Sequence, residues 1–128
     1  MTSEASIQRV EAQWTSLQLS EVPPSANNLF AHGMLGRFKT PAYKAWLTLA
    51  GHEINRQKPP RVAGAYALTL RFGRTRKRRD LDNCIKPVSD LLVSHGIVSD
   101  DALCREISAC WVAESGVHVM VVSTREAA

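Results

Sequence analysis

The sequence predicts a single-domain α/β (α+β) fold with a small mixed β-sheet, two helices and the element order β-α-β-α-β-β. Three observations carry this prediction. Apolar and polar residues alternate in several short segments, which is typical of half-buried strands. In two longer segments apolar residues recur at helical spacing. The chain has 128 residues, a length at which one domain buries a core of its own.

The first half of the chain contains one predicted strand and one predicted helix. Two leucines alternate with polar neighbours and predict a strand over residues 14–22, which the Pro- and Asn-rich loop 23–28 ends. Thr40, followed by a proline in the first turn, predicts the N-cap of a helix that runs to about Gln57. Residues 58–60, Lys-Pro-Pro, end it. Its predicted apolar face consists of Ala42, Trp46, Leu49, Ala50 and Ile54.

The second half begins with a strand and a helix. Strict alternation predicts a strand over residues 65–72, which runs directly into a basic loop. Leu81, Ile85, Val88 and Leu92 recur at helical spacing, and Gly96 supplies a natural C-cap. Pro87 falls inside this helix, so either the helix kinks there or the segment before it is a looser turn.

Two further strands are predicted at the end of the chain. Residues 97–103 form a short turn, and residues 104–112 and 117–123 are expected to pair as a hairpin. Their apolar faces around Trp111 and 119–121 exceed what one small sheet face needs. Part of them is therefore expected to form a homodimer interface.

Composition favours a globular protein with an anionic partner. Residues 1–13 are polar and are expected to form a flexible N-terminal extension, with the domain spanning residues 14–124. The net charge is +4, and six of the sixteen Lys and Arg residues lie within 71–79. A local excess of this kind indicates a docking surface.

Cysteine usage and hydropathy indicate a reducing compartment. Cys84, Cys104 and Cys110 are an odd number without metal-binding spacing, and are expected to be small buried apolar residues. No segment approaches the length of a membrane span, and the first residues lack a signal-peptide layout. A cytoplasmic location is expected.

The most informative segment places a basic run directly before two carboxylates. Residues 74–79 are Arg-Thr-Arg-Lys-Arg-Arg, and Asp80-Leu81-Asp82-Asn83 follow at once. Basic side chains bind polyanions through counterion release. Carboxylate oxygens favour Mg²⁺ or Mn²⁺ over softer metals. The alternatives are a solvated basic loop and aspartates that cap a helix.

Spacing brings further side chains toward these carboxylates. Asp80 and Asp82 can point to the same side if the backbone between them is extended. Lys86 lies one helical turn after Asp82 and can face the same space, or it can be a surface lysine paired with Asp82 or Asp90. Asp100-Asp101 follow the end of the helix, and spacing does not determine whether they return to the site. Asp100 is well placed to accept the free N–H groups of the turn.

These motifs resemble the RusA-type Holliday junction resolvases, endodeoxyribonucleases found mainly in bacteria and their prophages. The resemblance covers about residues 17–122. It is carried by Pro-Pro-Ser at 23–25 with two asparagines after it, by RKRRDLDNCIKP at 76–87, and by Gly-Ile at 96–97 leading to Asp-Asp-Ala at 100–102. It implies a homodimer that binds four-way DNA junctions in recombination and repair and cuts them with Mg²⁺, for which Mn²⁺ can substitute.

The resemblance also assigns site residues. It places the metal ligands on Asp80, Asp82 and Asp101, and the catalytic lysine on Lys86. The implied DNA contacts are Arg74, Arg76, Lys77, Arg78, Arg79 and Asn28. An inserted Ala26 leaves open whether Asn27 or Asn28 contacts the substrate. Relatives carry a lysine in the strand after the third aspartate, where this chain has Cys-Trp-Val at 110–112.

Two other classes compete with a junction nuclease. One is a non-catalytic branched-DNA-binding protein of the same fold, whose aspartates only cap a helix. The other is a phosphohydrolase or phosphotransferase acting on small molecules with an Asp-x-Asp metal site, which usually follows an apolar strand and not a basic run. No P-loop pattern is present, so no nucleotide cofactor is expected.

Overall fold

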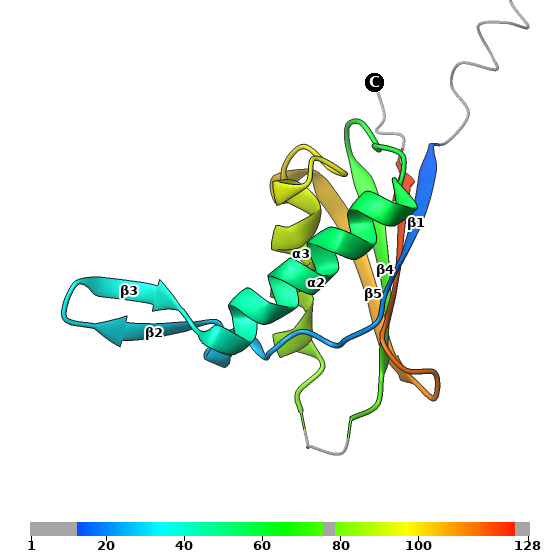
Figure 1. Cartoon of the computed structure of the whole chain (residues 1–128). Coiled ribbons are helices and arrows are strands. Elements are labelled where there is room, and N and C mark those ends of the chain that lie inside the picture. Colours follow the sequence, from blue (N-terminus) through cyan, green and yellow to red (C-terminus); the bar gives the residue numbers. More distant parts are fainter. Residues whose placement is uncertain (1–12, 76–78, 125–128) are drawn as a thin grey trace, which may run out of the picture.

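The computed structural model describes residues 13–75 and 79–124 and shows a two-layer α+β domain (Figure 1). A four-stranded sheet in the order β1-β6-β4-β5 carries both long helices on one face, and a separate hairpin, β2-β3, projects from the body. The strands are β1 (Trp14–Leu19), β2 (Phe30–Gly33), β3 (Gly36–Lys39), β4 (Tyr66–Gly73), β5 (Cys104–Val112) and β6 (Val117–Ser123). The helices are α2 (Pro41–Gln57) and α3 (Asp82–Ser94), with 3-10 turns η1 (Ala26–Asn28) and η2 (Asp101–Leu103).

The six predicted elements are present in the predicted order. The β2-β3 hairpin was not predicted, and β1 ends at Leu19, three residues earlier than expected. The predicted extension lies outside the described residues except for Gln13, which bonds to Ser123 at the end of β6. Within the described ranges, no helix has the length and apolar character needed to cross a membrane.

Helix α2 begins and ends where its sequence predicts. The Thr40 hydroxyl accepts a hydrogen bond from the Tyr43 N–H at 3.2 Å and caps the first turn. At the other end Lys58 adopts a left-handed conformation with φ 50°, and its N–H donates to the Ile54 carbonyl. Two predicted core positions, Ala42 and Leu49, were wrong, because both side chains are exposed. Leu49 is 39% exposed, because the buried face of α2 is centred on Trp46 and Ala50.

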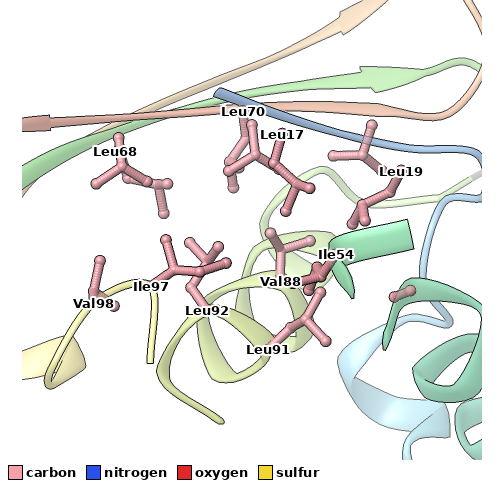
Figure 2. Close-up of a cluster of buried hydrophobic side chains, with 14 of the residues drawn as sticks. Leu17, Leu19, Ile54, Leu68, Leu70, Val88, Leu91, Leu92, Ile97 and Val98 are labelled. Carbon is pink, nitrogen blue, oxygen red and sulfur yellow. The ribbon is translucent and has the colours of Figure 1, made fainter. Parts of the chain in front are cut away.

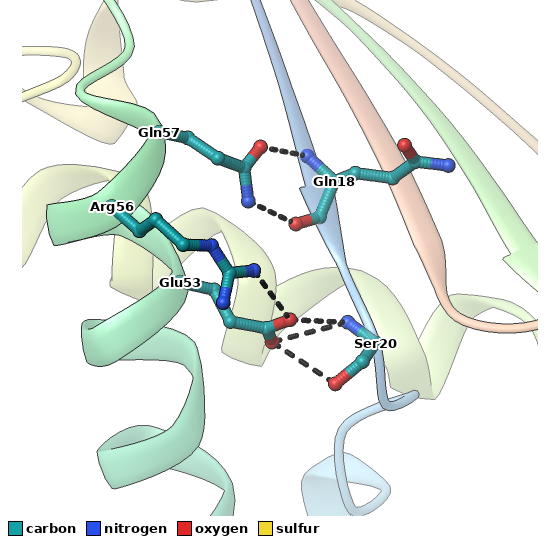
Figure 3. Close-up of polar contacts among 5 residues, drawn as sticks. All are labelled: Gln18, Ser20, Glu53, Arg56 and Gln57. Atoms are coloured by element: carbon teal, nitrogen blue, oxygen red, sulfur yellow. Dashed lines mark hydrogen bonds and ion pairs between the residues drawn. The ribbon is translucent and has the colours of Figure 1, made fainter.

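Side chains of α2 satisfy the free edge of β1 (Figure 3). The Gln57 side-chain amide accepts from the Gln18 N–H at 2.9 Å and donates to the Gln18 carbonyl. The Glu53 carboxylate, buried in the core, accepts from both the N–H and the hydroxyl of Ser20. An exposed edge would otherwise offer these backbone groups to another strand. The two side chains therefore fix β1 to α2.

The core lies between the helices and the inner face of the sheet (Figure 2). Val119 and Val121 are fully buried there, so the predicted use of 119–121 as a dimer interface is wrong for these two residues. Of the cysteines, Cys84 is buried as expected, Cys104 is half-buried and Cys110 is exposed. Cys110 was predicted to be buried, but it pairs opposite Arg71, on the face of the sheet turned away from the helices.

The predicted hairpin between β5 and β6 is wrong, because β4 lies between these strands. β4 pairs with β5 in parallel and with β6 antiparallel. Residues 113–116 therefore cross the end of β4, where the Gly73 N–H donates to the Gly116 carbonyl at 2.7 Å. A Cβ on Gly73 would lie 2.4 Å from the Glu114 carbonyl oxygen, so a side chain does not fit beneath this crossing.

We predict that two glycine-to-alanine substitutions have opposite effects on stability. Gly73→Ala places a methyl group against the backbone of the crossing segment and should lower the free energy of unfolding by about 1–3 kcal/mol. Gly51→Ala in α2 meets its nearest neighbour, His95, at an ordinary 3.7 Å. Because alanine has a higher helix propensity than glycine, this substitution should raise the free energy of unfolding by about 0.5–1 kcal/mol.

Urea unfolding of both variants beside the wild type measures the difference. Wild-type stability for Gly73→Ala would show that the crossing segment shifts freely and does not depend on this glycine.

Candidate active site

An open groove of about 1190 Å³ lies at the end of β4, beside the start of α3. Four parts of the chain form its walls. They are the end of β1 with η1, one face of α2, the loop after β4 with the first turn of α3, and residues 115–116 of the crossing segment. Its polar lining residues are Ser20, Glu21, Ser25, Asn27, Asn28, Arg74, Thr75, Arg79, Asp80, Asn83 and Ser115.

The asparagine wall of the groove is a short rigid turn. The Asn28 N–H donates to the Ser25 carbonyl at 2.8 Å, and the Asn28 side-chain amide donates to the Ser25 hydroxyl at 3.1 Å. η1 packs against α3, which brings this turn to the predicted acidic motif. Both Asn27 and Asn28 line the groove, so the structure does not choose between the two candidates.

Two of the predicted DNA-binding arginines also line the groove. Arg74 is anchored through its N–H to the Val112 carbonyl at 3.1 Å, and its side chain is exposed. Arg79 is half-buried at the other end of the basic loop. The predicted contacts Arg76, Lys77 and Arg78 lie outside the described residues. The loop thus presents an arginine to the groove from each of its described ends.

Asp80 and Asp82 lie around the start of α3. Both side chains are exposed, and Asp80 lines the groove. Burial raises the pKa of the nearby Cys84 thiol; the charge of Arg79 lowers it, and the charges of Asp82 and Asp80 raise it further. In the described part of the chain, neither carboxylate has a hydrogen-bond or ion-pair partner, and no side chain caps α3. The helix-capping alternative therefore does not account for these aspartates.

Lys86 lies one turn further along α3 and is paired with Asp90. Its Nζ atom is 3.0 Å from the Asp90 Oδ1 atom, so of the two partners left open by the sequence the structure selects Asp90. This hydrogen bond raises the pKa of Lys86 above its ordinary value, and the charge of Asp101 contributes in the same direction. Lys86 is therefore a firmly protonated side chain with Asp101 in its neighbourhood.

Asp101 reaches this region through η2, which packs against α3. Its charge also contributes to raising the pKa of Tyr66 to about 12, although burial of that hydroxyl is the larger cause. Asp100 serves the turn instead. Its Oδ1 atom accepts from the Ala102 N–H at 2.9 Å, as the sequence predicts.

The structure therefore distributes the predicted site residues along α3 in two sets. Arg79, Asp80 and Asp82 surround the start of the helix, and Lys86 and Asp101 lie about one turn on. Across residues 13–75 and 79–124, no three His, Cys, Asp or Glu side chains lie close enough together to hold a metal ion. The three predicted ligands thus have hard-oxygen chemistry suited to Mg²⁺ but do not form a closed cluster.

Two parts of the groove were missed by the sequence analysis. Asn83 lines it beside Asp80, and its place within the Asp-Leu-Asp-Asn motif was the available signal. Ala42, Ala45 and Leu49 form the wall on α2. The sequence analysis assigned Ala42 and Leu49 to the buried face of this helix with Trp46, but both are exposed and line the groove.

Comparison with known protein families gives a match. The family described as Endodeoxyribonuclease RusA matches residues 21–122, which is most of the chain and includes every described residue of the groove except Ser20. No curated protein matches the chain.

We predict that Asp100 contributes to the stability of the fold, whereas Asp101 contributes to activity and not to stability. The hydrogen bond from Ala102, and secondarily the Asp101 side chain, lower the pKa of Asp100 below its ordinary value of 3.8. A lowered pKa in the folded state stabilises the protein above about pH 3.8, and this stabilisation is lost as the pH falls through the folded-state value. Asp100→Ala should therefore melt at a lower temperature than wild type at pH 7, and the gap should close at acidic pH.

Asp101→Asn is the matched control, because it leaves the Asp100 cap in place and should melt like wild type. A pH-independent gap for Asp100→Ala would contradict the assigned role of the carboxylate.

Proposed function

Because the chain belongs to the RusA endodeoxyribonuclease family, whose members act on branched DNA, we propose that it resolves four-way DNA junctions in recombination and repair. The reaction is hydrolysis of a phosphodiester with Mg²⁺ as cofactor, for which Mn²⁺ can substitute, and without a nucleotide cofactor. The protein acts as a homodimer, since a four-way junction presents two equivalent strands and a two-fold dimer offers two equivalent sites.

One observation carries the proposal. Asn28, from η1, and Arg74, Arg79 and Asp80, from the loop after β4, line a single open groove. Cationic and amide side chains there can bind a phosphate backbone, since they are the groups that contact phosphates in protein–DNA complexes. A carboxylate in the same groove would repel that backbone unless a cation were bound with it. This combination favours a nuclease over a protein that only binds DNA.

The donor set fits a divalent metal. Asp80, Asp82 and Asp101 would hold Mg²⁺, because they supply hard oxygen atoms and the first two are free of partners among the described residues. When bound, Mg²⁺ lowers the pKa of a water molecule and stabilises negative charge on the phosphate. Asp80 and Asp82 lie at the start of α3, and Asp101 lies in η2, which packs against the same helix.

Lys86 is suited to act as a cation and not as a base. Its pKa is raised, so it remains protonated at neutral pH and has no lone pair with which to accept a proton. A protonated lysine can stabilise the charge that develops on the phosphate. To do so its Nζ atom leaves Asp90, which needs only a change of side-chain rotamer because the pair is partly exposed.

The first expected result is loss of cleavage when a proposed ligand is neutralised. Asp80→Asn, Asp82→Asn and Asp101→Asn should each lower the cleavage rate on a synthetic four-way junction by about 100-fold or more. Binding of the junction should stay equal or become tighter, because each substitution removes a negative charge near DNA. Removing Mg²⁺ with a chelator should abolish cleavage by the wild type.

Glu106→Gln makes the same change of charge on β5, away from the groove, and should cut normally. Near-normal cleavage by any of the three asparagine variants would refute the ligand assignment. Binding of junctions by the wild type without cleavage in Mg²⁺ or Mn²⁺ would favour the non-catalytic alternative.

The second expected result concerns the arginines of the groove. Replacing Arg74 and Arg79 together by alanine should weaken binding to junction and duplex alike, because phosphate contacts carry no sequence information. The slope of log K against log salt should become shallower by about 0.9 for each phosphate that the variant no longer neutralises. Fluorescence anisotropy over a salt series measures this slope.

Arg56→Ala with Arg61→Ala removes the same charge outside the groove and should leave the slope unchanged. Equal slopes for the two double variants would show that the groove does not contact the DNA backbone.

A further inference from the structure

We propose that the β2-β3 hairpin is a DNA arm that places Met34 and Leu35 into the branch point of the substrate. This inference rests on the proposed function and adds a specific contact to it. The arm consists of residues 30–39, and its tip is the pair Met34 and Leu35. Both tip side chains are fully exposed, at 104% each, and the arm projects clear of the body in Figure 1.

The tip residues are explained neither by packing nor by turn chemistry. They contribute nothing to the core, because both are fully exposed. Tight hairpin turns favour Asn, Asp and Gly, whereas this turn has Met-Leu between Gly33 and Gly36. Single exposed apolar residues are ordinary. Two adjacent ones at the end of a projecting hairpin indicate a contact with another molecule.

The arm has one basic face and one apolar face. Directly paired residues of a hairpin point to the same side, so His32 with Arg37, and Phe30 with Lys39, share a face. The Arg37 guanidinium stacks 3.6 Å from the centre of the Phe30 ring, which holds the charge on this face. The opposite face carries Phe38, which is 47% exposed.

The charge around the arm selects DNA as the occupant. Residues 22–52 contain three Lys or Arg residues and no Asp or Glu. This segment is therefore purely basic within a chain that carries 12 acidic residues, and it complements a polyanion. A second copy of the chain, which has a net charge of +4, is a poorer electrostatic match.

The base of the arm is continuous with the groove. Thr40, which follows β3, donates from its N–H to the Leu29 carbonyl at 3.0 Å and from its hydroxyl to the Asn28 carbonyl at 2.8 Å. Phe30 packs edge-on against Tyr43, with ring centres 5.7 Å apart. The arm is thus rooted beside Asn28, one of the groove residues, so DNA bound in the groove passes along it.

Insertion of the tip fits the chemistry of a branch point. Proteins that distort DNA insert Met, Leu, Ile or Phe between bases and partly unstack them. At a four-way junction the stack is already interrupted, so unstacking costs least there. The basic face would contact the flanking phosphates while the tip contacts bases, and the arm would distinguish branched DNA from a continuous duplex.

The test uses a four-way junction with 2-aminopurine at the branch point and a linear duplex of the same sequence. Binding is measured in a chelator, and cleavage is then measured in Mg²⁺. The wild type should increase the 2-aminopurine fluorescence of the junction. The variant Met34→Ser with Leu35→Ser should lose this increase and about tenfold in junction affinity, with duplex affinity within about twofold of wild type. Its melting temperature should be unchanged, because both side chains are fully exposed.

The matched control is Trp14→Ser with Ile107→Ser, which removes two other exposed apolar side chains from the sheet and should behave as wild type. If the tip variant keeps both the fluorescence increase and the junction affinity, the proposed contact of the arm with the branch point is refuted. Conversion of a wild-type dimer to a monomer by the tip substitutions, seen by light scattering, would also overturn it in favour of a contact between copies. If the wild type neither binds nor cuts junctions, both the proposed function and the proposed role of the arm are refuted. If the wild type cuts junctions but the tip substitutions have no effect, only the proposed role of the arm is refuted.

Discussion

The crossing at the end of β4 is the constraint on which the groove depends. β4 lies between β5 and β6, so the segment that joins those two strands must pass over its end. Gly73 allows this passage because a side chain there would collide with the crossing backbone. Its N–H donates to the Gly116 carbonyl of that segment at 2.7 Å, and the Arg74 N–H donates to the Val112 carbonyl at the end of β5 at 3.1 Å. The basic loop therefore leaves the sheet from a fixed point, and the start of α3 and its aspartates are placed relative to it.

The opposite wall is fixed by polar contacts at the edge of the sheet. Glu53 and Gln57 hold the backbone of β1 against α2 and leave its edge groups satisfied. A buried carboxylate is costly unless it is hydrogen-bonded, and Glu53 accepts bonds from both polar groups of Ser20. The chain that leaves β1 at Ser20 is thereby directed along α2 into η1. Both walls of the groove are thus set by hydrogen bonds to the backbone of residues that line it, such as Ser20 and Gly73.

Local chemistry made much of this fold predictable from the sequence. The pairing of strands across the sheet could not be predicted in this way. Thr40 with its following proline marks a helix start that depends only on neighbouring residues. The alternation in β4 likewise reflects one buried face.

The pairing of β5 and β6 was misjudged because a short connection predicts a hairpin unless another strand intervenes. The role of Gly73 appears only in three dimensions. The β2-β3 hairpin was missed because its large apolar residues other than Phe30 face solvent and show no alternation. For the site, the position of Asp80 beside two arginines followed from adjacency. The partner of Lys86 could not be predicted from the sequence, because Asp82 and Asp90 are equally spaced from it along the helix.

That equal spacing has a chemical consequence for the proposed metal site. Asp82, Lys86 and Asp90 lie four residues apart on α3, so the ammonium group of Lys86 can reach either carboxylate. Were it bound to Asp82, it would occupy the oxygen atoms that a divalent cation needs. Its bond to Asp90 leaves Asp82 free and keeps the positive charge about one turn away, near Asp101. Asp90 would then act as a positioning residue, which holds the lysine off the ligand until the phosphate arrives and competes for it. The order of the three charges on one helix face would thus keep the lysine away from the proposed metal ligand Asp82.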